Sequence, residues 1–308
     1  MRLFSIEAIS SILGERSIDI AKDRPVFAPA IDKTGIAVVH ETDGTAADLA
    51  VRAVTDVARQ KSGIVDTLDA MIVVTQSSEM LLPSMAFEIQ DRCRIHKGVM
   101  ALDVNQGCSG FVQALQLAVS SLDWAESVLI VCADRYRAKL RPSDRSTNSV
   151  FSDAATATLI SRRPSLQIVA SAHHSDGSGR PLLFQSHKSD INEGRLHMAG
   201  SDVWLFTKRV VFNQIERLVN SCDLTLADID AVYLHQASEL VLKGLRAQIG
   251  DRTSVPSELK DVGNTVSSSI PILIENRINQ LTEQISVLCG FGVGLSASSL
   301  LIRPSRLN

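Results

Sequence analysis

The chain has 308 residues, of which 45% are hydrophobic, and a formal net charge of −3 at pH 7. Only 4% of the residues are aromatic and no basic run is interleaved with them, which argues against a nucleic-acid-binding protein. No apolar run reaches the ~18 residues of a membrane-spanning helix, and the first residues lack the apolar stretch of a signal peptide.

The cysteines are odd in number, scattered, and form no Cys-x-x-Cys pair. They are Cys93, Cys108, Cys132, Cys222 and Cys289. This pattern excludes a disulfide framework and a zinc site. We therefore expect a cytoplasmic protein in a reducing environment, without a metal.

Short apolar runs alternate with helical patterns along the chain. The predicted strands and helices, in chain order, are strand 70–75, helix 84–94, strand 99–104, helix 109–122, strands 127–132, 155–160 and 166–170, helix 202–220, strand 231–234, helices 239–249 and 267–281, and strands 285–289 and 296–302. Such alternation is typical of a layered α/β fold.

Two pairs of similar segments indicate an internal duplication. Residues 68–77 resemble residues 229–238, and residues 126–132 resemble residues 283–289 at nearly the same offset. We predict two related halves, 1–170 and 171–308, that share one continuous core.

Cys108 lies between a predicted strand and a predicted helix, in residues 106–111 (Gln-Gly-Cys-Ser-Gly-Phe). A helix N-terminus stabilises a thiolate, so we expect the pKa of this thiol to fall below the ~8.5 of free cysteine. A single cysteine is more often a small core residue. Gly107 and Gly110 favour the alternative, a nucleophile in a tight bend that a ligand can approach.

His235 and Asn264 are the candidate partners of this nucleophile. His235 ends a predicted strand, where open α/β sheets place functional groups. Asn264 lies just before a predicted helix, and each residue alone could be structural. Together, a cysteine, a histidine and an asparagine suit acyl transfer. The thiolate attacks a thioester, and the other two side chains donate hydrogen bonds to an oxygen that gains charge.

A glycine-rich segment, residues 290–294 (Gly-Phe-Gly-Val-Gly), follows a predicted strand. It lacks the Lys-Ser/Thr pair of a phosphate-binding loop, and another strand follows it rather than a helix. A loop that offers a backbone N–H to an oxyanion is the better interpretation.

Taken in order, these segments resemble the β-ketoacyl-[acyl-carrier-protein] synthase III family of the thiolase superfamily. Residues 106–111 match its nucleophile motif, residues 234–238 its His-Gln-Ala-Asn motif, residues 263–271 its Gly-Asn-Thr motif and residues 290–294 its terminal glycine-rich loop. The resemblance implies a thiolase-like α/β fold with five layers, α-β-α-β-α. It also implies a homodimer.

The resemblance implies a decarboxylating Claisen condensation. Cys108 would accept an acyl group from a thioester of coenzyme A or of the phosphopantetheine of an acyl carrier protein. The backbone N–H groups of Cys108 and Val293 would hold the oxyanion. His235 and Asn264 would bind the thioester oxygen of a malonyl-type extender, and no bound cofactor is expected.

The resemblance also implies a set of substrate-contacting residues. They are Leu82, Lys33, Arg145, Phe151, Trp204, Lys208 and Arg209. Leu82 takes the place of a residue that lines the partner subunit's acyl pocket.

Three positions depart from the family pattern: Pro29 replaces a tryptophan that stacks on adenine, Leu205 replaces a basic residue, and Val293 replaces a glycine. The arginine that follows the His-Gln-Ala-Asn motif is also missing. We therefore expect a specialised enzyme rather than the initiator of fatty-acid synthesis.

Two alternatives stay open. An acyltransferase of the same fold would pass the acyl group from Cys108 to a hydroxyl or an amine, with His235 as general base. Asn264 favours condensation, because an aspartate would be expected there for transfer. A non-catalytic subunit that pairs with an active relative would not be expected to keep all three residues.

Overall fold

The chain folds around one long strand, β7 (Ala154–Ser175), in a computed structural model that describes residues 2–186 and 191–305. The first part of β7 pairs antiparallel with β6 (Ser127–Asp134), and its second part pairs with β12 (Ser296–Pro304). Strand β1 (Arg2–Leu13) pairs with both parts and shifts register between Phe4 and Ser5. The strands predicted at 155–160 and 166–170 are therefore one element.

The main sheet has the order β10-β11-β12-β7-β6-β4-β5 among the described residues. Its remaining strands are β4 (Ala70–Val74), β5 (Met100–Val104), β10 (Ala231–Leu234) and β11 (Ser286–Gly292). The predicted boundary between residues 170 and 171 falls inside β7, so both halves share one sheet. The division into two related halves stays a prediction.

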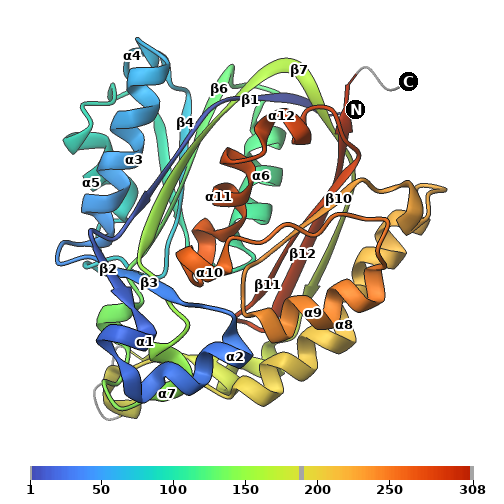
Figure 1. Ribbon diagram of the computed structural model, residues 1–308. Helices are drawn as coiled ribbons and strands as arrows, with labels where there is room; N and C mark the ends of the chain where they lie inside the picture. The colour runs from blue at the N-terminus through green and yellow to red at the C-terminus, as the bar shows by residue number, and fades with distance from the viewer. Residues whose placement is uncertain (1, 187–190, 306–308) are drawn as a thin grey trace.

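Helices cover the outer faces of this sheet and fill the space between its two parts (Figure 1). One outer layer packs on β1, β6 and β7, a middle layer lies between the sheet parts, and a second outer layer packs on β11, β12 and β7. The first outer layer contains α3 (Ala46–Gln60) and α5 (Met85–Arg92). The middle layer contains α6 (Gly110–Ser121) and α11 (Ser269–Glu275). The second outer layer contains α8 (Gly200–Asn220) and α9 (Glu239–Ile249). The predicted five-layered arrangement is confirmed.

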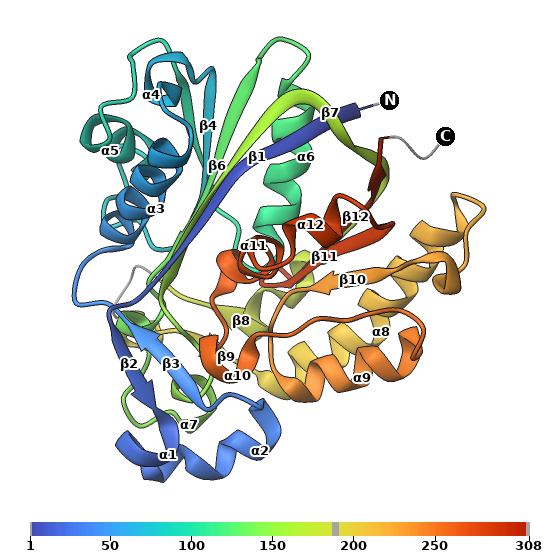
Figure 2. The ribbon, with the colours of Figure 1, turned by 45° about the horizontal axis from the view of Figure 1, so that its top comes forward.

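The short elements lie mainly around one end of the sheet (Figure 2). The helices are α1 (Ile20–Asp23), α2 (Ile31–Thr34), α4 (Ile64–Thr67), α7 (Arg145–Asn148), α10 (Leu259–Val262) and α12 (Ile278–Leu281). The strands are β2 (Arg16–Asp19), β3 (Val38–Glu41), β8 (Leu183–Phe184) and β9 (His197–Met198). No helix in the described ranges is long and apolar enough to cross a membrane.

The central helix α6 shows why the layers form. Its side chains Val112, Leu115, Ala118 and Val119 are buried, and the helix contacts both β4 and β6 on one side and β11 and β12 on the other. A helix that is apolar around its circumference is stable only between two covering layers. By contrast, α3 buries a single face and is closed at its start by a capping box that includes Thr45.

Two elements have different boundaries in the structure from those predicted from the sequence. The helix predicted at 267–281 is divided into a short 3-10 turn (Val266–Ser268), α11 and α12, because Arg277 leaves the helical conformation. The guanidinium of Arg277 pairs there with Glu258 at 2.7 Å. Strand β11 continues to Gly292, so the predicted glycine-rich loop begins inside a strand.

Strand β11 passes directly against the turn between β5 and α6, at Gly290. A Cβ atom on Gly290 would lie 2.6 Å from the carbonyl oxygen of Cys108 and 2.7 Å from the Cα of Ser109. Backbone atoms on both sides cannot withdraw as a flexible side chain can. The sheet and the turn can touch only because this position has no side chain.

We predict that Gly290→Ala lowers the free energy of unfolding by about 1–3 kcal/mol, the usual cost of overpacking. Gly177→Ala is the matched control, because a Cβ atom there meets nothing within 4 Å. Urea denaturation followed by circular dichroism measures both variants. Equal stability of the two variants would show that the turn yields at little cost.

Candidate active site

Cys108 lies in the turn that joins β5 to α6, just before the N-cap residue Ser109. The cysteine is buried, with 8% of its surface exposed. Strand β11 presses against it, since a Cβ atom on Gly292 would lie 3.1 Å from the Cys108 sulfur. The thiol therefore has backbone on one side and a cavity on the other.

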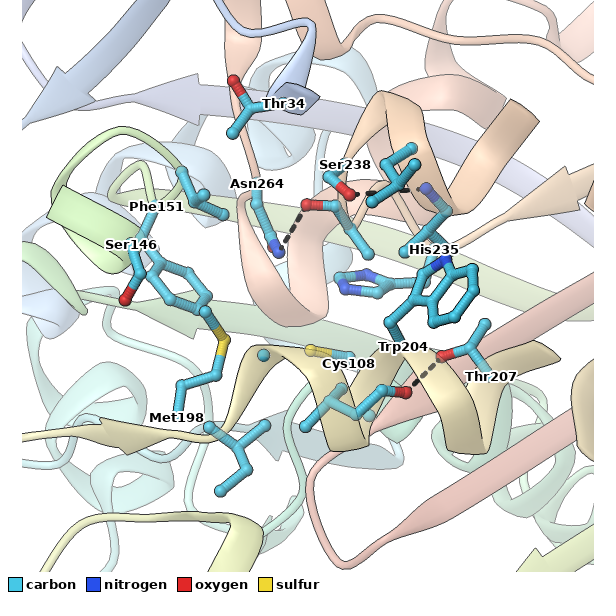
Figure 3. A pocket seen from close by; sticks show the side chains of 18 of the residues that line it. Thr34, Cys108, Ser146, Phe151, Met198, Trp204, Thr207, His235, Ser238 and Asn264 are labelled. Atoms are coloured by element: carbon cyan, nitrogen blue, oxygen red, sulfur yellow. Dashed lines mark hydrogen bonds between the residues drawn. The ribbon is translucent and has the colours of Figure 1, made fainter. Parts of the chain in front are cut away.

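Cys108, His235 and Asn264 all line this cavity, whose volume is about 290 Å³ (Figure 3). The three come from the β5–α6 turn, the end of β10 and the loop before α11. Most of the remaining wall is apolar: Val150, Phe151, Leu183, Met198, Val203, Trp204, Leu240, Val241 and Phe291. The fold thus gathers three polar groups, distant in sequence, on one apolar cavity.

His235 is fixed from two sides. Its Nδ1 hydrogen-bonds the Ser269 hydroxyl at 2.7 Å, and its ring meets Phe291 edge-on with centroids 5.5 Å apart. Burial lowers the pKa of His235 to about 3, and a backbone hydrogen bond with Val266 offsets part of this shift. The imidazole is therefore neutral at pH 7, with one nitrogen that donates and one that accepts.

Asn264 is held so that its amide nitrogen is the group offered to the cavity. Its backbone N–H donates to the Val150 carbonyl at 2.9 Å, and its side-chain oxygen accepts from the Val266 N–H at 2.9 Å. The Nδ2 atom donates a long bond of 3.4 Å to the Ala237 carbonyl. The side chain can thus act as a donor toward a substrate oxygen (Figure 3).

Comparison with known proteins decides the family. Residues 102–177 match the family model of 3-oxoacyl-[acyl-carrier-protein (ACP)] synthase III, and residues 219–304 match that of its C-terminal part. A β-ketoacyl-[acyl-carrier-protein] synthase III from Streptococcus pneumoniae (strain Hungary19A-6) is 30% identical over 292 residues, 88% of each chain. The chain belongs to the synthase III family.

Solved structures agree with this assignment. A 3-oxoacyl-(acyl-carrier-protein) synthase III structure with 30% sequence identity overlaps 97% of this chain and 99% of its own, with a TM-score of 0.89. The synthase III of Pseudomonas aeruginosa PAO1 is 26% identical, overlaps 98% of each chain and gives a TM-score of 0.88. The predicted thiolase-like fold is confirmed.

The expected low pKa of the Cys108 thiol is wrong for this synthase III-like site. Burial raises that pKa to about 12, and the Asp134 carboxylate adds to the shift. The backbone N–H groups of Cys108 and Val293 act in the opposite direction but do not outweigh burial. Since His235 is also neutral, the cavity holds an uncharged thiol and an uncharged imidazole.

Three of the predicted substrate-contacting residues, Lys33, Phe151 and Trp204, line the same cavity. Lys208 lines a neighbouring groove between α8 and α9, with its ammonium 5.4 Å from the centroid of the Trp204 ring. Among the described residues, Lys33 is the one Lys or Arg side chain that lines the cavity. The roles of all four in binding stay predictions.

The other three predicted contacts lie outside the cavity. Arg145 and Arg209 are exposed and do not line it. Leu82 is 86% exposed and stands beside Met80 and Leu81 in the loop before α5. Within one chain, Leu82 therefore cannot touch an acyl group on Cys108, and its predicted role requires a second subunit.

Sequence reasoning missed two residues of the site. Ser269, which orients His235, lies inside the matched Gly-Asn-Thr segment but has no role assigned by the motif. Tyr136 is buried on the cavity wall, with its ring 5.2 Å from that of Phe151. Its position just beyond the buried strand β6 was the available signal, because such strand ends commonly carry functional groups.

The raised thiol pKa gives a testable pH dependence for the free enzyme. Only the thiolate reacts with iodoacetamide, and below the pKa its fraction rises about tenfold per pH unit. We predict that alkylation of Cys108 accelerates continuously from about pH 7 to about pH 9. Cys108→Ser measures the background from Cys93 and Cys222, which are only half-buried. A rate that levels off near neutral pH would show a stabilised thiolate instead.

Proposed function

We propose that the protein catalyses a decarboxylating Claisen condensation between an acyl thioester and a malonyl-type thioester. The observation that carries the proposal is the cavity in which Cys108 faces His235 and Asn264. Membership of the synthase III family supports the reaction class. Coenzyme A or the phosphopantetheine of an acyl carrier protein would present the substrates.

In the first half-reaction the sulfur of Cys108 attacks the carbonyl carbon of the acyl thioester. The thiol proton leaves through the neutral imidazole of His235 to the departing carrier thiol. The backbone N–H groups of Cys108 and Val293, which both reach the thiol sulfur, would hold the oxyanion. The products are an acyl-cysteine and a free carrier thiol.

In the second half-reaction the malonyl carboxylate leaves as carbon dioxide and an enolate forms. The amide nitrogen of Asn264 and a ring N–H of His235 would donate hydrogen bonds to the enolate oxygen. The carbanion then attacks the acyl carbonyl, a carbon–carbon bond forms, and the bond to Cys108 breaks. A proton taken up from water converts the Cys108 thiolate back to the thiol, so no cofactor enters the balance.

The entrance of the cavity supports a specialised pathway. The resemblance implies basic residues for carrier docking, but Leu205 stands at one of these positions, and Leu240, at 50% exposure, lines the cavity. The acidic residue next to Leu240, Glu239, forms an ion pair with Arg246 at 2.8 Å. An apolar entrance suits a carrier different from the one that housekeeping synthases use.

We also propose a homodimer. Met80, Leu81 and Leu82 expose 61%, 75% and 86% of their surfaces in one loop. Strand β5 is the edge of the main sheet, and an unpaired edge readily joins a second copy. Pairing across β5 would bury this neighbouring apolar loop, which fits the predicted role of Leu82 in a partner's acyl pocket.

We predict that Asn264→Ala separates the two half-reactions. Acylation of Cys108 should persist, because the amide does not serve the oxyanion at the sulfur. Release of carbon dioxide from malonyl thioesters should fall about 100- to 1,000-fold, the usual cost of one lost donor. Intact-mass spectrometry measures acylation, and labelled malonyl thioester measures carbon dioxide. Cys108→Ser, which should not acylate, is the control.

The outcomes distinguish the alternatives. An enzyme that acylates on Cys108 but releases no carbon dioxide from any malonyl thioester, and transfers the group to an alcohol or amine, is an acyltransferase. If no thioester in a broad panel acylates Cys108, the protein is neither a condensing enzyme nor an acyltransferase.

The dimer has its own test. Leu82→Asp should shift the mass in light scattering from twice the 33.3 kDa chain mass toward one chain. Val26→Asp, which charges a side chain of 52% exposure away from β5, should leave the dimer intact. A monomeric wild type, or a dimer unaffected by Leu82→Asp, would contradict the proposed interface.

A further inference from the structure

A second cavity adjoins the nucleophile cavity and has no role in the reaction proposed above. Its volume is about 360 Å³, and it shares Tyr136, Leu183 and Val293 with the first cavity. Unlike the first, it is lined mainly by polar and cationic groups. They are Gln76, Ser78, Asn105, Lys139, Arg180, Gln185 and Ser186.

Lys139 supplies a half-buried cation to this second cavity. Its ammonium donates to the Gln76 carbonyl and lies 5.6 Å from the centroid of the Tyr136 ring. Among the residues that the structure describes, no carboxylate lies within 4.0 Å of the ammonium. Burial lowers the pKa of Lys139, and the more distant carboxylates of Asp134, Glu79 and Asp153 offset only part of this shift.

Arg180 supplies a second cation from the 3-10 turn Gly177–Leu182. It is exposed, and no ion pair joins it to any other residue within the described ranges. The acidic groups near Lys139 are committed elsewhere: Asp134 accepts hydrogen bonds from Ser267 and from the Gln76 backbone, and Glu79 faces Arg135 at 3.9 Å. Two cations therefore line one polar cavity, and neither forms an ion pair within the described part of the chain.

The wall between the two cavities lies directly beside the nucleophile. Tyr136 donates to the side-chain oxygen of Gln76 at 2.6 Å, and the Gln76 amide donates to Asn105 at 3.3 Å. Gly107, the neighbour of Cys108, is so close to this wall that a Cβ atom would lie 2.6 Å from the Gln76 oxygen and 2.9 Å from Val293. Tyr136 and Val293, which line both cavities, therefore form the boundary that a chain attached to Cys108 would cross to enter the second cavity.

We propose that the acyl group carried by Cys108 is an ω-carboxyacyl group, derived from a short dicarboxylic acid, whose free carboxylate binds Lys139 and Arg180 in the second cavity. The proposal rests on the proposed function. The sulfur of Cys108 forms the new thioester bond, the bond to the carrier thiol breaks, and that thiol leaves with the proton. The distal carboxylate keeps its charge throughout.

The extender's carboxylate does not explain these cations. It must leave as carbon dioxide while His235 and Asn264 hold the adjacent thioester oxygen, and both residues line the first cavity. A cation beside that carboxylate would stabilise the charge that has to disappear. A purely apolar acyl chain would in turn desolvate Lys139, Gln76 and Asn105 without replacing their bonds to water.

The test compares thioesters matched in chain length. Second-order rates of Cys108 acylation are measured by intact mass with succinyl- and butanoyl-coenzyme A, and with glutaryl- and pentanoyl-coenzyme A. We expect the carboxylated member of at least one pair to react at least about tenfold faster, as charge-assisted hydrogen bonds would give. Lys139→Gln should reduce this ratio about tenfold, and Arg180→Gln should reduce it less. Arg59→Gln, on the outer helix α3, is the matched control.

Each result decides the proposal. A faster reaction of the apolar member in both pairs would overturn the ω-carboxyacyl proposal and leave the condensing function intact. If the rate ratio falls equally in Arg59→Gln, the preference for a carboxylated acyl group reflects only the net charge of the protein, and the proposal is also overturned. Absence of acylation with every thioester would instead refute the proposed function. Should Lys139→Gln not fold by circular dichroism, the exposed Arg180→Gln carries the comparison.

Discussion

The site depends on the contact between strand β11 and the turn that carries Cys108. Gly290 and Gly292 leave no side chain at this contact, where a Cβ atom on Gly292 would lie only 3.1 Å from the sulfur of Cys108. The contact brings the N–H of Val293 to a thiol that belongs to the other part of the sheet. Because β7 pairs with both parts, it holds the Cys108 turn and Val293, the proposed nucleophile and oxyanion donor, at a fixed separation. Neither part of the sheet could build the site alone.

Burial at this contact determines the charge state of the free site. It raises the pKa of Cys108 to about 12 and lowers the pKa of His235 to about 3. Both groups are therefore uncharged before substrate arrives, which avoids an isolated charge in an apolar cavity. In the proposed condensation, charge would appear only on the oxyanion and on the enolate, and the fixed N–H donors would hold these oxygens. The donors are oriented in advance, so little reorganisation accompanies the reaction.

Local patterns predicted much of this molecule. Strand alternation located the main strands, and the motifs around Cys108, His235 and Asn264 located three side chains of one cavity. The failures share a cause, because each depends on packing between distant segments. The continuity of β7 is set by pairing with β1, and the break at Arg277 accompanies an ion pair with Glu258. The direction of the thiol pKa depends on how completely β11 and the cavity wall exclude water, which no local motif encodes.

The two cavities differ in polarity, and this difference connects the departures from the family pattern. The exposed Leu240 lines the nucleophile cavity together with Lys33, and Leu205 stands where the resemblance implies a cation for a carrier. Lys139 and Arg180, which form no ion pair within residues 2–186 and 191–305, line the second cavity, which shares Tyr136 and Val293 with the first. Positive charge at the entrance would recognise the carrier, whereas positive charge in the second cavity would, as proposed above, recognise the acyl group. Under the ω-carboxyacyl proposal, electrostatic recognition in this chain would have moved from the carrier to the group that Cys108 accepts.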